Sequence, residues 1–322
     1  MARLLRRVGV AGATVIGVSL ITFIVLDALP GDPLAAYAPP DVTRRLDDAQ
    51  REALAHELGL DRPLLVRYAE WCGGVLRGDL GRSLRSRRPV AEELARRLIP
   101  TLELNLAAFA LVLIFGLPLG WWAARRPGTP LERFTSLGLL ALYAAPSFWI
   151  AMVLQHLFAV RWGLLPLYGR TPPSGPSGPL VRLAHLALPA SCLALHGLAF
   201  YARLARNTAR EGLSSWHALE ARTLGVTERR VFFRHALRPS LVALATLLGL
   251  VLPAFVSGSV LIESLFGWPG LGRLYVQAVL SRDFPVVLGL TVLTGSLTVA
   301  GSLLADMIAG LIDPRWRAGD ER

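Results

Sequence analysis

The sequence predicts an all-α membrane protein, a bundle of six transmembrane helices. Hydrophobic residues make up 53% of the 322 residues, charged residues only 18%, and the mean hydropathy is +0.47. Six apolar stretches are each about 20 residues or longer, the length that a helix needs to cross the hydrocarbon core of a bilayer. The basic residues, all of them arginine, concentrate in alternate connecting segments. Length, composition and charge placement therefore agree on a polytopic helix bundle.

The predicted spans are, in chain order, Val8–Leu29, Leu102–Ala124, Phe134–Val160, Leu183–Tyr201, Leu241–Ile262 and Pro285–Ile312. Seventeen of the 34 arginines lie in segments that would face the cytoplasm, whereas five lie in the short outer loops. Because short cytoplasmic loops carry an excess of positive charge, both termini are expected in the cytoplasm. The outer loop after the third span departs from this pattern, since Arg161, Arg170 and Arg182 have no acidic residue near them in the sequence.

The first span resembles a secretory signal peptide in its basic start, which contains Arg3, Arg6 and Arg7. Its apolar run is longer than the 7–15 residues usual for such a peptide, and five further spans follow. Residues 1–29 are therefore expected to stay in place as a transmembrane anchor.

The segment 30–100 is the one sizeable region predicted outside the bilayer. It opens with the turn signal Pro30–Pro33 and continues with an amphipathic stretch, Asp48–Leu58, which stops at Gly59. A second apolar and basic stretch runs over Leu64–Leu76. Twelve arginines and eleven acidic residues leave the segment almost neutral. It is expected to form an extracytoplasmic cap, which the sequence allows to be either a docking or gating surface or a structured connector.

The loop between the fourth and fifth spans, residues 203–239, is predicted to form two short helices joined at a glycine. Ser215 can cap the first helix, Gly225 can take the left-handed conformation that ends it, and Thr227 can cap the second. A rigid, basic helical elbow on the cytoplasmic side can receive force from a soluble partner. The pattern is typical of the membrane half of a pump.

Several kinds of chemistry are excluded or disfavoured. The chain has no lysine, so it has no conventional phosphate-binding loop and no Schiff-base lysine. Its two cysteines, Cys72 outside and Cys192 within the fourth span, have no metal-ligand spacing and are not expected to form a disulfide. No cofactor or metal site is expected. A membrane-embedded enzyme is the main alternative class, but His-Glu-x-x-His and Gly-x-Ser-x-Gly motifs are absent.

Within the spans, three features are open to a transport or a packing interpretation. The glycines of Gly116–Gly120 have the spacing that lets membrane helices approach closely, which favours packing. Pro146 and Ser147 in the third span can form a kink beside the pathway or a plain packing kink. His185 and His196 in the fourth span are intramembrane ionisable groups, which can be functional or neutral and hydrogen-bonded.

Short motifs then run almost from end to end in a specific order. They are Pro30–Pro33, Leu58–Leu64, Gly78–Ser83, Pro89-Val90, Pro100–Leu102, Gly258–Glu263 with Phe266, Pro269–Arg273, Arg282–Val287 and Asp313–Arg315. Together they resemble the permease subunit of the dipeptide, oligopeptide and nickel class of bacterial ABC importers, in the type that begins with one span and a long outer loop.

That family has a coupling signature of Glu-Ala-Ala, three residues, then Gly. Counting back from Gly225 puts Leu219 at the glutamate position. The peptide-permease branch ends its signature in Ala-Arg-Ala-Lys-Gly, and Leu224 here takes the place of the lysine. The resemblance implies an ATPase-coupling elbow that contains Ala218, Leu219, Glu220, Ala221, Arg222 and Gly225.

The resemblance also implies the rest of the machine. It implies a type I importer permease fold in the bacterial inner membrane, which pairs with a second, non-identical permease. Two cytoplasmic ATPases would hydrolyse ATP, and an extracytoplasmic solute-binding protein would deliver a peptide or similar small solute. Lipid is the surrounding partner, and nucleic acid is not one. A tethered DNA-binding module is disfavoured, because the elbow is confined between two spans.

The predicted organisation has four parts. These are a transmembrane anchor over residues 1–29, an extracytoplasmic cap over 30–100, a five-helix permease core over 101–312 with the elbow at 203–239, and a cytoplasmic tail over 313–322.

Overall fold

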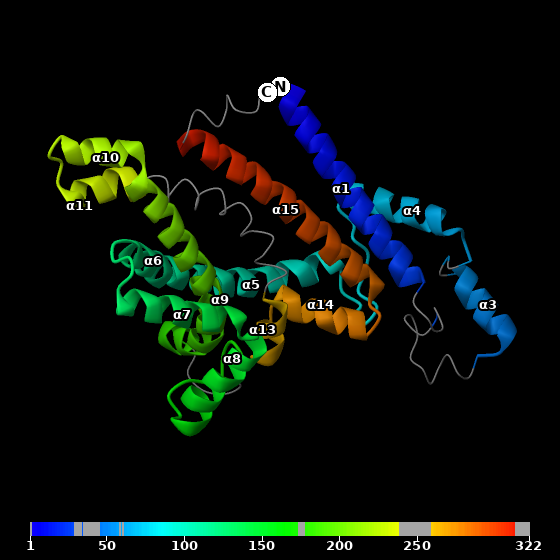
Figure 1. The fold of residues 1–322 in the computed structure, drawn as a ribbon. Helices are drawn as coiled ribbons and strands as arrows, with labels where there is room; N and C mark the ends of the chain where they lie inside the picture. Colours follow the sequence, from blue (N-terminus) through cyan, green and yellow to red (C-terminus); the bar gives the residue numbers. More distant parts are fainter. Residues whose placement is uncertain are drawn as a thin grey trace. The chain divides into compact units, whose positions relative to one another are not determined.

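The protein is helical throughout the part of the chain that the computed structural model describes (Figure 1). The described residues are 2–28, 34, 46–57, 59, 61–172, 178–237 and 259–312. Among them the one β-type pairing is an isolated bridge between Arg82 and Pro89. The all-α class predicted from the sequence is therefore confirmed. The chain divides into two compact units, Met1–Ile99 with Gly270–Val299 and Pro100–Pro269 with Ala300–Arg322.

The helices of the first unit are α1 (Ala2–Asp27), α3 (Asp48–Glu57), α4 (Leu64–Leu76), the start of α5 (Val90–Leu111), α14 (Leu271–Leu280) and most of α15 (Phe284–Ile312). The second unit contains the rest of α5, the π-helical turn η2 (Val112–Gly116), α6 (Leu117–Ala124), α7 (Pro130–Ala144), α8 (Ser147–Leu154), η3 (Gln155–Arg161), α9 (Pro179–Ser214), α10 (Trp216–Thr223), α11 (Glu228–Val231), η4 (Phe232–Ala236) and α13 (Val260–Leu265).

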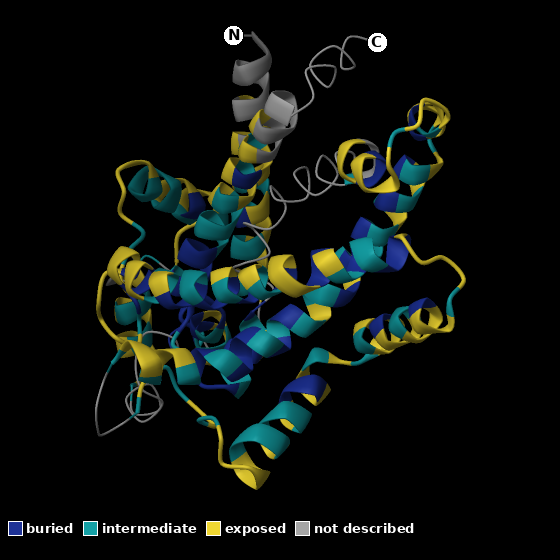
Figure 2. Ribbon diagram, turned by 90° about the vertical axis from the view of Figure 1, so that its left-hand side faces the viewer, coloured by how far each residue is buried: buried dark blue, intermediate teal, exposed yellow. Residues whose placement is uncertain are grey.

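Three helices are long and apolar enough to cross a membrane, Val90–Ala124, Pro179–Ser214 and Phe284–Leu304, and α1 supplies a shorter apolar helix from Gly12 to Asp27. The predicted fifth span, Leu241–Ile262, lies mostly outside the described residues. Buried and exposed residues alternate along the helices (Figure 2), as expected for helices that bury one face.

The third predicted span is broken rather than continuous. The two helices Pro130–Ala144 and Ser147–Arg161 meet at 103°. The break has a local cause, because a residue that precedes proline is pushed out of the α conformation. Ala145, which precedes Pro146, is accordingly extended, with φ −72° and ψ 132°.

In the first unit, α4 packs against α1 through polar as well as apolar contacts. The Tyr68 hydroxyl lies 2.8 Å from that of Ser19 and donates to the Ile16 carbonyl at 2.9 Å, and Arg67 pairs with Asp27 at 2.5 Å. The amphipathic stretch and the apolar, basic stretch noted in the segment 30–100 form helices at Asp48–Glu57 and Leu64–Leu76.

Two motifs that are 200 residues apart in the sequence meet in the same unit. The Asp283 carboxylate, only 3% exposed, accepts hydrogen bonds from the Ser83 hydroxyl at 2.5 Å and from the Leu84 amide at 3.0 Å. A buried carboxylate needs such donors to offset its lost hydration. The turn before α5 is thereby fastened to the start of α15.

The second unit is organised around α9, which packs against both α6 and α7. A file of fully buried small residues, Ala199, Ala202, Ala205 and Ala209, runs along α9. At Gly120 the backbones are so close that a Cβ atom would lie 2.2 Å from the Ala202 carbonyl oxygen and 2.9 Å from the Ala205 Cβ. The close approach predicted for the Gly116–Gly120 stretch is confirmed.

We predict that Gly120→Ala lowers the stability of the purified chain in detergent by about 1–3 kcal/mol, because the added methyl group forces α6 away from α9. The midpoint of thermal unfolding measures the effect. Gly138→Ala on α7 is the matched control, since a Cβ there meets nothing within 4 Å. The control should be neutral or slightly stabilising, as alanine favours a helix over glycine. Equal losses in both variants would contradict the close-packing argument.

Candidate functional site

The predicted elbow at the end of α9 is a compact helical hairpin, in which α10 and α11 lie side by side (Figure 1). Ser215 caps α10, since its hydroxyl accepts from the Ala218 amide at 3.3 Å. Gly225 ends the first arm with φ +75°, as the sequence predicts. Thr227 begins α11, but its side chain makes no capping bond; its carbonyl accepts from the Arg230 amide at 2.9 Å instead.

Two of the predicted coupling residues face the inside of this hairpin. Ala218 is fully buried and Ala221 is 8% exposed, and both pack with the buried Val231 of α11. Leu213 of α9 and Val226 complete the cluster. Their small side chains let α10 and α11 approach each other and the end of α9. These alanines therefore set the shape of the hairpin.

Arg222 ties the hairpin together. Its Nε donates to Glu228 Oε1 at 2.7 Å and its Nη2 to Oε2 at 3.3 Å, while its Nη1 donates to the Leu213 carbonyl at 3.0 Å. One guanidinium thus bonds to α9 and to the first residue of α11. The hydrogen bonds from Arg222, more than its charge, hold the pKa of Glu228 below its usual range.

The outer surface of the hairpin is unexpectedly apolar. Leu219 is 44% exposed, and beside it in the chain Glu220 is also exposed. Trp216 and Leu224, which the sequence reasoning did not place in the site, are 86% and 75% exposed. The exposure of Leu224 could have been predicted from the sequence, because this residue takes the place of a lysine in the family that the chain resembles. Trp216 had a weaker signal, its position directly after the helix cap.

A cavity of about 830 Å³ lies between the hairpin and the ends of α6 and α9. Leu219, Arg222 and Glu228 line it from the hairpin, and Arg125 and Arg210 from the ends of the long helices. Glu211 and Glu228 also line the cavity, so both signs of charge face it. The hairpin nevertheless packs on the end of α9, since Leu213 lies against its buried cluster.

At the break in the third span, Pro146 is exposed and starts α8, and Ser147 is its first residue. The structure brings His196 of α9 to this place, because its ring stacks on Tyr143, the second-last residue of α7, at 5.7 Å between ring centroids. His185 has a different role. It is buried, and its Nδ1 donates to the Gly169 carbonyl oxygen at 3.0 Å.

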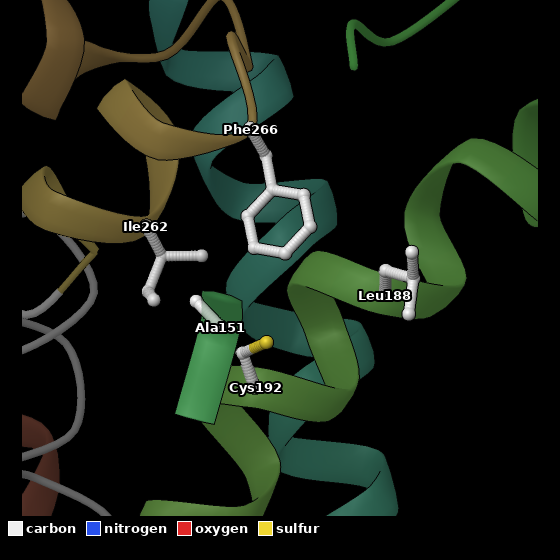
Figure 3. Packing of buried hydrophobic residues seen from close by; sticks show 5 residues of the cluster. All are labelled: Ala151, Leu188, Cys192, Ile262 and Phe266. Carbon is white, nitrogen blue, oxygen red and sulfur yellow. The ribbon is translucent and has the colours of Figure 1, made fainter. Parts of the chain in front are cut away.

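The motif around α13 joins this helix to α5, α8 and α9 within the second unit. Glu263 is fully buried, and its Oε1 accepts from the Thr101 hydroxyl at 2.8 Å and the Ser259 hydroxyl at 2.9 Å. The indole of Trp268 donates to the Pro100 carbonyl at 2.8 Å. Beside them the Phe266 ring points into an apolar cluster (Figure 3). Its buried members are Ala151, Leu188, Cys192, Ile262 and Phe266.

The arginines of the outer loop after the third span find an acidic partner that the sequence did not suggest. Arg170 donates to Glu103 of α5 at 2.5 and 2.9 Å, and Arg182 lies 3.7 Å from the same carboxylate. The pairing was hidden because Glu103 is 67 residues away from Arg170 in the chain. Within the described ranges, no cluster of three His, Cys, Asp or Glu side chains could hold a metal ion.

Comparison with known proteins gives a consistent result along the whole chain. Residues 116–318 match the family described as binding-protein-dependent transport system inner membrane component, and residues 1–105 match the N-terminal family of these membrane components. An oligopeptide transport system permease protein of Bacillus subtilis is 35% identical over 318 residues, and a dipeptide transport system permease protein of Escherichia coli is 35% identical over 336 residues. Each alignment covers 98% of this chain and 98% of the relative.

A putative peptide transport system permease protein of Brucella abortus is 38% identical over 320 residues, which are 98% of this chain and 99% of its own. Among solved structures, a chain of the MetNI methionine ABC transporter in an inward-facing conformation superposes with a TM-score of 0.51. The superposition covers 67% of this chain and 96% of that one at 20% identity, so it shows a shared fold.

We predict that the hairpin loosens in acid. Because the folded pKa of Glu228 is lowered, its ion pair stabilises the hairpin above the ordinary pKa of glutamate, about 4.3, and this contribution is lost as the pH falls through the folded value. Hydrogen-exchange protection of the Val226 amide, which donates to the Ala221 carbonyl, reports the change. Glu228→Gln should lower this protection already at pH 7. Glu220→Gln is the control. An equal loss of protection in this variant would refute the stabilising role of the Arg222–Glu228 pair.

Proposed function

The chain belongs to the family of binding-protein-dependent transport system inner membrane components, and we propose that it forms one half of the translocation pathway of an ATP-driven peptide importer. It is a transport permease rather than an enzyme. The peptide substrate class is supported by the relatives, which are named as oligopeptide and dipeptide permeases over almost their full length. The elbow at the end of α9 is the observation that carries the mechanism.

The elbow combines an exposed apolar surface with a rigid interior, as a part that receives force from a partner requires. Its exposed apolar residues, Trp216, Leu219 and Leu224, offer a surface that a soluble ATPase can cover. Behind them, Arg222 bonds to both α9 and α11, and Ala218 is fully buried against the hairpin core. Force applied to the surface is therefore passed to α9 rather than absorbed by bending of the loop.

The predicted coupling residues then divide into two groups. Leu219 and Glu220 are exposed and would contact the ATPase directly. Ala218, Ala221, Arg222 and Gly225 would act by keeping the hairpin in shape. This division explains why a leucine is tolerated at the glutamate position of the family signature, since the position lies on the surface and not in the hairpin core.

The proposed assembly follows the family. The permease core would comprise residues 101–312, with the fifth of six spans at 241–262 and a cytoplasmic tail at 313–322. The anchor 1–29 would precede an extracytoplasmic cap, 30–100, that seats the solute-binding protein. A second, non-identical permease would complete the pathway, and two ATPases would dock at the elbows. Both termini and the elbow would face the cytoplasm of an inner membrane, as the arginine distribution indicates.

The alternative of a membrane-embedded enzyme has no observation in its favour. No motif typical of such an enzyme is present in the sequence, and Asp283 and Glu263, two of the buried acids among the described residues, are engaged in hydrogen bonds that hold the fold.

We predict that Gly225→Val uncouples the importer. The valine must adopt φ +75°, a strain of about 1–3 kcal/mol, and a Cβ there meets nothing within 4 Å, so the strain alone acts on the hairpin. Substrate-stimulated ATP hydrolysis of the assembled complex should be lost while the chain still inserts into the membrane.

Gly128→Val is the matched control for that variant. Gly128 has φ +77° and equally open surroundings, but it lies in the α6–α7 turn rather than in the elbow. It should bear the same strain and keep stimulated hydrolysis. Normal coupling in the Gly225 variant would mean that the elbow is only a connecting loop.

We predict opposite sidedness for two exposed positions. In a background with Cys72→Ser and Cys192→Ala, Leu224→Cys should react with an impermeant thiol reagent only from the cytoplasmic side, and Leu76→Cys only from outside in spheroplasts. Both native leucines are highly exposed, at 75% and 89%, so access does not limit the reaction. Labelling of position 224 from outside would overturn the six-span topology.

A further inference from the structure

Three side chains of the second unit form a column beside the break between α7 and α8. The ring of Tyr143, at the end of α7, stacks on His196 with an interplanar angle of 14°. The guanidinium of Arg203 lies 5.2 Å from the centroid of the same tyrosine ring. His196 and Arg203 are seven residues apart and so lie on one face of α9, about 10 Å apart along its axis. We refer to Tyr143, His196 and Arg203 as the 143–203 column.

This face of α9 is not covered by the described residues. Tyr143 of α7 is 46% exposed, His196 is exposed, and Phe200 between the two polar residues is 45% exposed. His196 and Phe200 lie on a helix that is long and apolar enough to span the membrane, and Tyr143 lies near the end of the first half of the broken span. Ionisable side chains at such depth rarely face lipid, because burial of their polar atoms in hydrocarbon is costly. The face is therefore suited to water or to another protein surface.

Arg203 differs from the next arginine on the same helix. Arg206 is paired with the buried carboxylate of Glu132. Both arginines keep one buried N–H donor without a hydrogen-bond partner, Nη2 of Arg203 and Nε of Arg206, but Arg203 has no carboxylate partner among the described residues. A buried N–H donor without an acceptor is unfavourable. The tyrosine ring positions the Arg203 cation but leaves its Nη2 donor unused, and no described residue supplies an acceptor.

We infer that the 143–203 column lines the translocation pathway and that Arg203 transiently binds a carboxylate of the passing substrate. This inference rests on the proposed import function and assigns its substrate contacts. A guanidinium binds a carboxylate through parallel N–H donors, which an aromatic ring cannot replace. Every linear peptide with a free terminus carries one carboxylate whatever its side chains. One well-placed cation therefore serves many peptides, and His196 adds a polar contact about two helical turns further out.

The break at Pro146 fits this assignment. Because α7 ends at Ala144, one residue after Tyr143, the tyrosine lies at the point where the third span turns by 103°. The turn takes α8 into the outer cluster of Ile262 and Phe266. Consequently the pathway residues predicted from the sequence act together. Pro146 and Ser147 shape the opening of the translocation pathway, and His196 lies on its wall.

The test measures the accessibility and electrostatic environment of position 196 in the assembled importer in liposomes. His196→Cys is introduced into the chain that carries Cys72→Ser and Cys192→Ala. The probes are two water-soluble methanethiosulfonates, one with an anionic sulfonate and one with a cationic trimethylammonium group. We expect both to modify position 196, with the anionic reagent favoured. Adding Arg203→Met should lower the ratio of anionic to cationic rates about fourfold, because one charge about 10 Å away, at a dielectric constant near that of water, acts on the two reagents in opposite directions.

Matched variants separate a specific contact from a general loss of charge or of fold. Arg203→Lys keeps the cation and should keep most of the preference for the anionic reagent. Arg182→Met removes the same charge from the same helix, 14 residues from position 196, and should leave the ratio unchanged because salt screens it. Arg203→Gln replaces Arg203→Met if the latter does not assemble.

Two results would overturn the inference. A thiol at position 196 that neither reagent modifies would place this face against lipid or a protein partner. If Arg203→Met and Arg203→Gln leave the rate ratio unchanged, Arg203 does not bind the carboxylate of the substrate. In both cases, ATP hydrolysis that depends on this chain would still support the proposed function. Absence of that hydrolysis in the unmodified complex would instead refute the proposed function itself.

Discussion

The close approach of α6 to α9 at Gly120 is the contact on which the second unit depends. In a membrane, helices gain little from apolar burial against each other because lipid is equally apolar, so close van der Waals packing has to hold them. Gly120 lets α6 rest against the backbone of α9 at Ala202, and the buried alanines of α9 continue that contact in both directions. The elbow and the 143–203 column are both carried by α9, so their positions depend on this one interface.

A second constraint acts at the outer end of the same unit. Glu263 is buried without any exposed surface, and hydroxyl groups of α5 and of the residue before α13 hydrogen-bond its carboxylate. Trp268, also fully buried, bonds to the α5 backbone at Pro100. Such a network is favourable only when all its donors and acceptors are satisfied. These hydrogen bonds fix the position of α13 against α5, while Phe266 fills the apolar space between α8 and α9.

The elbow shows how a family signature can combine structural and contact residues. Half of its small and charged residues are internal: alanines that allow close packing, and an arginine that bonds across the hairpin. The other residues face outward; among them Leu219 and Leu224 are apolar, the latter where the peptide branch of the family has lysine, and Glu220 is charged. Variation on the outer face changes the surface offered to an ATPase, whereas variation on the inner face would change the hairpin itself. The described structure therefore explains which departures from the signature the fold can accept.

Sequence reasoning was strongest where the cause is local. The cap at Ser215 and the left-handed glycine at 225 depend on neighbours in the chain, and both were predicted. The close glycine contact of α6 was also readable from its spacing. The sharp break at Pro146 was only partly foreseen, because a proline signals a kink but not its angle.

Tertiary structure decided the contacts between distant residues. Asp283 with Ser83, Glu103 with Arg170, and Tyr143 with His196 and Arg203 join residues that are 53 to 200 positions apart. No periodicity or motif encodes such pairs, since each depends on how whole helices are placed by packing. The sequence by itself therefore determined the class of protein, the helices and the location of the elbow. Only the folded chain showed which elbow side chains face outward and which arginine of α9 pairs with a buried carboxylate, because exposure and pairing are properties of the packed helices.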